Sequence, residues 1–186
     1  MNTRNFCGRS LSALALLLGV LLVGAPANTR GQDEPLLIPD VVDYTKLLPI
    51  LPEPREGWTA DKPEGSTEDL GEMKITNVHR DFQQGGATDA PTTAISILDS
   101  ASNPEYVDST TAAWDTNVSD EEGYTKTVTI DGMPGFETFE NDGRHGTLWL
   151  MVAKRYFLQI ETSNQDPKEL REWLKLIDLK KLAEIK

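Results

Sequence analysis

Cysteine is almost absent from this sequence: the single cysteine, Cys7, lies near the amino terminus, ahead of the first long apolar run. Lipoprotein precursors carry their modified cysteine after that run, so Cys7 does not indicate lipid attachment. If the amino-terminal segment is cleaved off, the mature chain has no thiol and no disulfide, although small exported domains often use disulfides. Its stability must then come from a packed apolar core.

The first 27 residues contain the three parts of a secretory signal peptide. Arg4 and Arg9 form a basic start, and Leu11–Val23 is an apolar stretch of about 13 residues that ends before the small residues Ala25-Pro26-Ala27. This stretch is shorter than the roughly 20 residues that a membrane-spanning helix needs. The sequence therefore predicts cleavage after Ala27 and an exported protein, periplasmic or extracellular, with no membrane span once the signal is removed.

Basic residues are scarce, with 18 Lys and Arg against 30 Asp and Glu and a formal net charge of −12. Removal of the signal peptide takes away two arginines and no acid, so the mature chain is more acidic still. The distribution is uneven, because residues 33–150 hold 24 acids against 7 bases, whereas Met151–Lys186 holds 6 acids against 8 bases. Acidic surfaces repel duplex DNA and anionic membranes. We therefore expect no nucleic-acid partner. An acidic surface keeps an exported protein soluble, and it could also bind cations or basic partners.

Three parts are expected along the chain: a signal peptide over 1–27, a proline-rich leader segment over 28–56 and a single domain over 57–186. Prolines 35, 39, 49, 52 and 54 prevent long regular structure in the leader segment. Between them, Val41–Leu48 is expected to form two helical turns whose apolar residues dock on the domain.

Alternating and helical patterns predict the elements of that domain. Strands are expected over 73–82, 92–98, 124–130, 136–140, 147–152 and 156–162, the last two as a hairpin. Asn103-Pro104 and Asp166-Pro167 each pair a capping residue with a proline, which is typical of a helix start. After the second pair, Leu170, Trp173, Leu174 and Ile177 form an apolar stripe. The order β-β-α-β-β-β-β-α predicts an α+β fold with an antiparallel sheet of about six strands and packed helices.

The threonine-rich run 124–130 leads into Asp131-Gly132-Met133-Pro134-Gly135-Phe136, then two strands and a closing helix. This order, over Trp58–Lys186, resembles the Mog1/PsbP-like fold. The ending Ile177-Asp178-Leu179-Lys180-Lys181-Leu182-Ala183 is similar to that of uncharacterised exported bacterial proteins with the same body plan. The resemblance implies an accessory or binding role, as in photosystem subunits and transport-factor regulators. It assigns no functional residue to this chain, because the matching motifs are turns and apolar stripes.

Signatures of catalysis are missing from the sequence. It has no G-x-S-x-G and no S-x-x-K, and Gly85-Gly86 lacks the lysine and helix of a phosphate-binding loop. The two histidines, His79 and His145, have no partner at a metal-ligand spacing, so we interpret both as ordinary surface or edge residues. Trp58, Trp114 and Trp149 are expected to serve core or edge packing.

The most specific-looking polar cluster is Asp115-Thr116-Asn117-Val118-Ser119-Asp120-Glu121-Glu122. It opens like a calcium loop, with oxygen-bearing side chains at Asp115, Asn117 and Ser119. The required sixth-position glycine is Asp120, however, and the required twelfth-position glutamate is Lys126. Asp115, Asn117, Ser119, Asp120 and Glu121 are therefore candidates for a weak calcium site only, and a solvated loop is the preferred interpretation.

These observations favour a non-catalytic exported binding or accessory module that needs no cofactor. Its partner would be an unknown protein or small ligand of the cell envelope, met by the threonine-rich sheet face or the acidic loop. One alternative is a hydrolase that uses unmarked carboxylates, which requires polar side chains that converge in a deep pocket. A second alternative is a weak calcium-dependent binding domain.

Cleavage of the signal peptide can be tested by mass spectrometry of the exported protein. We expect the mature chain to begin at Asn28. Replacement of Ala27 by Arg should block cleavage at this position, because the cut site needs small residues. Export of a chain that still begins at Met1 would contradict the prediction.

Overall fold

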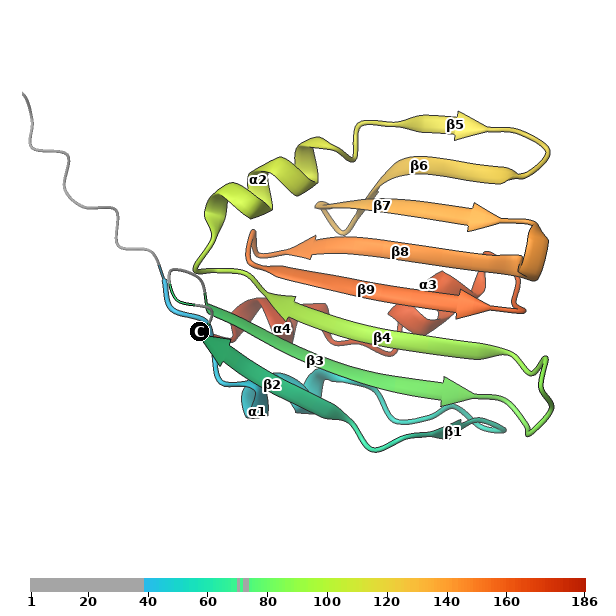
Figure 1. Ribbon diagram of the computed structural model, residues 1–186, viewed down its shortest axis with the longest axis horizontal. Helices are drawn as coiled ribbons and strands as arrows, with labels where there is room; N and C mark the ends of the chain where they lie inside the picture. Colours follow the sequence, from blue (N-terminus) through green and yellow to red (C-terminus); the bar gives the residue numbers. More distant parts are fainter. Residues whose placement is uncertain (1–38, 70, 72–73) are drawn as a thin grey trace, which may run out of the picture. The chain divides into compact units, whose positions relative to one another are not determined.

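Nine β-strands form one antiparallel sheet in the computed structural model (Figure 1). The strand order is β1-β3-β4-β9-β8-β7-β6-β5, and β2 pairs with β3 beside β1. The structure describes residues 39–69, 71 and 74–186, which belong to one unit. The predicted signal peptide, its cleavage site and residues 28–38 lie outside the described residues. Within the described part of the chain, no helix is long and apolar enough to cross a membrane.

The bounds of the strands are β1 Thr59–Ala60, β2 Glu64–Asp69, β3 Lys74–Gln83, β4 Thr92–Asp99, β5 Asn117–Ser119, β6 Gly123–Ile130, β7 Met133–Glu140, β8 His145–Val152 and β9 Tyr156–Ser163. The helices are short: α1 Tyr44–Leu47, α2 Pro104–Ala112, α3 Glu169–Leu174 and α4 Leu179–Glu184, with 3-10 turns η1 Leu48–Ile50 and η2 Asp142–Arg144.

The predicted fold class is wrong. About 42% of the described residues lie in strands and 21% in helices, and the sheet has nine strands where about six were expected. The expected α+β, Mog1/PsbP-like arrangement is therefore replaced by one large antiparallel sheet. The three missed strands, β1, β2 and β5, are short or polar; β2 reads EGSTED and is a strand only because it pairs with β3. Such segments carry no apolar alternation from which a strand could be predicted.

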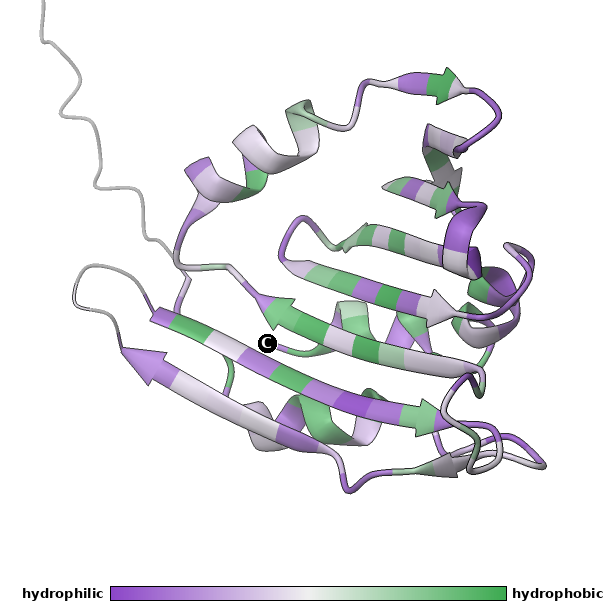
Figure 2. Cartoon of the chain, turned by 45° about the vertical axis from the view of Figure 1, so that its right-hand side comes forward, coloured by the Kyte–Doolittle hydropathy of each residue, from purple (hydrophilic) through white to green (hydrophobic). Residues whose placement is uncertain are grey.

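The apolar patterns themselves are placed as predicted. Hydrophobic and hydrophilic residues alternate along β3 and β4 (Figure 2). In the β8–β9 hairpin, Leu148, Leu150 and Val152 and then Tyr156, Leu158 and Ile160 all enter the main core. In its three-residue turn, Ala153 and Lys154 have positive φ values of 54° and 53°.

The C-terminal stripe is also confirmed, although the helix is shorter than its pattern. Leu170, Trp173, Leu174 and Ile177 are all buried in the main core. Asp166 does not cap α3 with its side chain; its carboxylate pairs with Arg144 instead. Asp178 ends the first helical segment and caps α4, since its Oδ1 accepts the Lys181 N–H at 2.9 Å.

The leader segment supplies part of the main core. α1 forms within the predicted helical turns, and Val42, Leu47, Ile50 and Leu51 pack with the sheet and with α3 and α4. These residues therefore dock as expected, and they also close one face of the sheet, which we call the helix face. In the view of Figure 1, α1, α3 and α4 lie behind the sheet.

A smaller core lies on the other face, under α2. Val107 and Trp114 pack there against Met151 and Phe157, and Trp149 lies at the margin of the same cluster. α2 begins as predicted, because the Asn103 Oδ1 accepts the Tyr106 N–H at 3.0 Å and Pro104 occupies the first turn. The helix covers only the end of the sheet at which β4 finishes and β9 begins.

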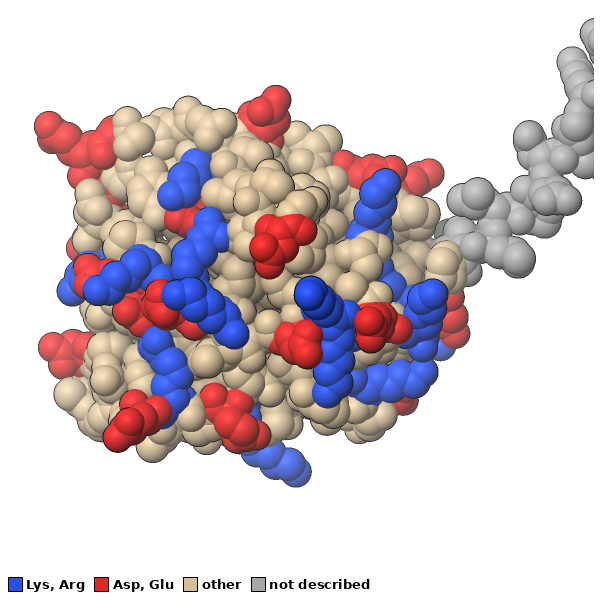
Figure 3. Space-filling model, turned by 180° about the vertical axis from the view of Figure 1, so that it is seen from behind, with Lys and Arg blue, Asp and Glu red and all other residues tan. Residues whose placement is uncertain are grey.

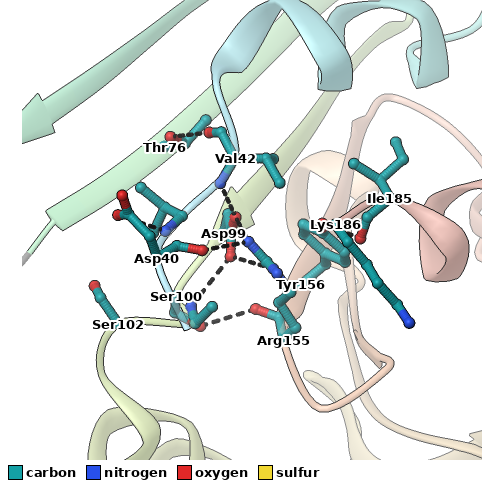
Figure 4. A network of polar contacts seen from close by, with 12 residues as sticks. Asp40, Val42, Thr76, Asp99, Ser100, Ser102, Arg155, Tyr156, Ile185 and Lys186 are labelled. Carbon is teal, nitrogen blue, oxygen red and sulfur yellow. Dashed lines mark hydrogen bonds and ion pairs between the residues drawn. The ribbon is translucent and has the colours of Figure 1, made fainter. Parts of the chain in front are cut away.

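A buried ion pair ties the leader segment to the sheet (Figure 4). Asp99, at the end of β4, is fully buried, and its two carboxylate oxygens accept Arg155 Nε at 2.9 Å and Nη2 at 2.7 Å. The main-chain N–H of Val42 donates to the same carboxylate at 2.7 Å, and Arg155 Nη2 also donates to the Asp40 carbonyl at 2.8 Å. One carboxylate thus joins β4, the β8–β9 turn and residues 40–42.

Tyr156 extends this network to the carboxyl terminus. Its hydroxyl donates to the Ile185 carbonyl at 2.9 Å. Burial raises the pKa of Tyr156 to about 12, so the hydroxyl keeps its proton and remains a donor at neutral pH. Both ends of the described chain are therefore bound beside the β8–β9 turn.

Asp99→Asn should lower the free energy of unfolding by about 3–5 kcal/mol, because it leaves the Arg155 guanidinium without its counter-charge in a buried place. Urea unfolding at neutral pH measures this change. The exposed substitution Asp108→Asn on α2 serves as the control and should change the value by less than about 0.5 kcal/mol. An unfolding midpoint for Asp99→Asn equal to that of the control would show that the ion pair does not hold the leader segment.

Candidate functional site

One face of the sheet is largely free of helices, and we call it the open face. Side chains alternate between the two faces of a strand, so the residues between the core positions of five strands point there. They are Asn77, His79, Asp81 and Gln83 on β3; Thr92, Ala94 and Ser96 on β4; Gln159, Glu161 and Ser163 on β9; His145, Thr147 and Trp149 on β8; and Thr138 and Glu140 on β7. None of them is a lysine or an arginine.

His145 is the centre of a polar cluster on this face. Its Nδ1 lies 3.1 Å from Ser163 Oγ, and its Nε2 lies 3.3 Å from Glu161 Oε1. Gln159 Nε2 donates to the other carboxylate oxygen of Glu161 at 3.4 Å. Sequence spacing had shown no metal-ligand partner for His145, and strand pairing brings Ser163 and Glu161 to it.

The order hydroxyl, imidazole, carboxylate also occurs in nucleophilic hydrolases, which in addition need donors for an oxyanion. The two main-chain N–H groups that follow Ser163 are already used: Asn164 donates to the Gly143 carbonyl at 3.0 Å and Gln165 to the Arg144 carbonyl at 3.4 Å. These two N–H groups are therefore engaged within the fold and do not point to an oxyanion beside Ser163.

A cavity of about 360 Å³ adjoins this cluster, where β1 meets β3, β4 and β9. We call it the corner cavity. Its lining includes three carboxylates, Asp61, Asp81 and Glu161, together with Gln83 and Ser163, and it contains no lysine or arginine. Within the described part of the chain, the side chains of Asp61, Asp81 and Gln83 form no hydrogen bond or ion pair. These polar groups are available to a ligand.

The buried carboxylate Glu137 on β7 is engaged from three sides. The Tyr124 hydroxyl donates to its Oε1 at 2.7 Å, Lys126 Nζ lies 2.9 Å from the same atom, and Arg171 Nη2 on α3 lies 2.5 Å from Oε2. Burial raises the pKa of Tyr124, and the hydrogen bond to Glu137 adds to this shift. The arrangement connects β6, β7 and α3 on the helix face.

Opposing effects act on the pKa of Glu137. Burial alone would raise it, but the hydrogen bonds from Tyr124 and Lys126 and the charge of Arg171 together hold it below the ordinary value of 4.5. Glu137 is therefore ionised at neutral pH. Asp99 and Glu137 are the buried carboxylates among the described residues, and each is ion-paired with an arginine.

The calcium candidates lie around β5, at the edge of the sheet opposite β1. Asn117 and Ser119 belong to β5, and Asp120 Oδ1 accepts the N–H groups of Glu122 at 2.9 Å and Gly123 at 3.1 Å. Asp120 thus closes the β5–β6 turn. Asp115, Asp120 and Glu121 form no group of three metal-binding side chains with each other or with other described residues.

Comparison of the chain with protein-family models, with curated proteins and with solved structures found no match. The candidate site therefore depends on the geometry of the open face alone.

Glu137 makes the stability of the fold depend on pH in a defined direction. Because its folded-state pKa lies below 4.5, its ionised form stabilises the fold above that pH, and the contribution is lost as the pH falls through the folded-state pKa. Glu137→Gln should lower the free energy of unfolding at pH 7 by about 3 kcal/mol and flatten its decline below pH 4.5.

Urea unfolding at a series of pH values measures both effects. Glu140→Gln on the same strand is the matched control, because Glu140 is exposed and its replacement should leave the wild-type slope in place. Parallel curves for Glu137→Gln and wild type would contradict the assignment.

Proposed function

We propose that the protein is a non-catalytic exported binding module that holds a partner of the cell envelope on its open face. The observation that carries the proposal is the asymmetry of the sheet. One face is closed by the leader segment, α3 and α4, whereas the open face has a polar cluster, a cavity and half-buried side chains. The export signal in the sequence supports a place of action outside the cytoplasm.

The alternative of a carboxylate-based hydrolase has less support. A general base must lie within reach of the substrate, whereas the carboxylates of Asp99 and Glu137 are buried and each is held in an ion pair with an arginine. Glu161 lines the corner cavity, but it is half-exposed, and its carboxylate contacts both His145 and Gln159. These contacts suit the orientation of a binding surface.

Two steric variants test the proposal. Ser96→Arg and Thr138→Arg place a long side chain on the open face without touching the main core, and each should abolish retention of an envelope protein that binds the immobilised wild type. Ala183→Arg on α4 adds the same side chain to the helix face. This variant should still bind the envelope protein. Melting temperatures of the three variants should agree within a few degrees.

Selective loss with both open-face variants is the expected result in affinity purification from the envelope fraction. Equal retention by all three variants, or loss with Ala183→Arg alone, would refute the open face as the binding surface.

A further inference from the structure

Charge is distributed unequally between the two faces of the sheet. Figure 3 shows the helix face, where Lys and Arg side chains lie among Asp and Glu side chains. Many acids outside the open face are paired there or at its margins: Glu169 with Arg55 at 2.9 Å, Glu53 with Arg80 at 3.2 Å and Glu172 with Lys175 at 2.7 Å. On the five strands named above, the open face has Asp81, Glu161 and Glu140 but no lysine or arginine. Among the described residues, no lysine or arginine neutralises the negative charge of these strands.

We infer that the open face docks an extended basic segment of a partner protein, with one lysine or arginine side chain of that segment in the corner cavity. This inference rests on the proposed function and names the chemistry of the partner. Complementary charge gives an interface its orientation and raises its association rate. A basic segment supplies the cations that the open face lacks.

The corner cavity has the size and lining that such a side chain requires. Its volume of about 360 Å³ is near the lower end of the range for ligand pockets, about 300–1,000 Å³. Ala94 provides apolar surface for the methylene groups, while Asp61 and Asp81 provide carboxylates for the charged end. Both carboxylates are free of other partners among the described residues, so a bound cation would displace no existing ion pair.

Polar groups beyond the cavity favour a segment over a small amine. The cluster of His145, Ser163, Glu161 and Gln159 borders the cavity and crosses from β9 to β8. A small amine would fill the cavity and leave this cluster unused. An extended segment seated in the cavity would also meet the cluster, with hydrogen-bonding groups of its main chain facing the sheet.

Fluorescence anisotropy with a fluorescein-labelled hexalysine peptide and the full mature protein tests the inference. We expect binding at low salt that weakens as salt is added, and no binding of a hexaglutamate peptide. Asp61→Asn/Asp81→Asn should weaken hexalysine binding about tenfold, since each exposed charge pair contributes up to about 1 kcal/mol. Because neither side chain has a hydrogen bond or ion pair among the described residues, the variant should keep the wild-type melting temperature.

Glu121→Gln/Glu122→Gln is the matched control, because it removes the same charge at the opposite edge of the sheet, where both side chains are exposed. It should change the affinity less than twofold. Equal weakening by both double variants would mean that net charge alone attracts the peptide, and it would overturn the inference. Spermidine that binds as tightly as hexalysine would overturn the choice of a segment.

The result separates this inference from the proposed function. If hexalysine does not bind, or binds equally well to the Asp61→Asn/Asp81→Asn variant, the inference that a basic segment docks on the open face is wrong. The open face still stands as the binding surface if Ser96→Arg and Thr138→Arg lose the envelope partner. If those two variants retain the partner, the proposed function fails whatever the peptide does.

Discussion

The buried carboxylate of Asp99 is the contact on which the rest of the structure depends. It accepts two hydrogen bonds from Arg155 and one from the Val42 main chain, so it joins the end of β4, the β8–β9 turn and the leader segment. Val42 and the residues after it then fill one side of the main core. A buried charge without its partner is costly, and this cost binds the leader segment to a single position.

Closure of the helix face has a consequence for the other side of the sheet. The leader segment, α3 and α4 use most of the apolar surface of the chain, and the ion pairs around them use many of its cations. α2 covers only one end of the opposite face, over Met151 and Phe157. The remaining surface is polar and acidic, and the His145 cluster orders its side chains. The face on which we propose binding is thus the one that folding does not need.

Several elements could be predicted because their apolar residues repeat at a regular spacing. The stripe from Leu170 to Ile177 and the alternation of β8 and β9 are examples, and the burial of these residues follows directly. β2 could not be predicted, since EGSTED has no such repeat. The His145 cluster could have been predicted, because counting back from the hairpin turn places His145 opposite Ser163. The approach of Asp61 to Asp81 could not have been predicted, because no local pattern in the sequence relates β1 to β3.

The sequence by itself determined which side chains share a face, where the chain turns and which residues must be buried. These properties are local, because they follow from the periodicity of strands and helices and from turn residues such as Asp131-Gly132. Only the tertiary structure decided how many strands join the sheet, which acids find a cation and which face remains open. These are contacts between distant residues, and polar residues show no periodic pattern that would predict them.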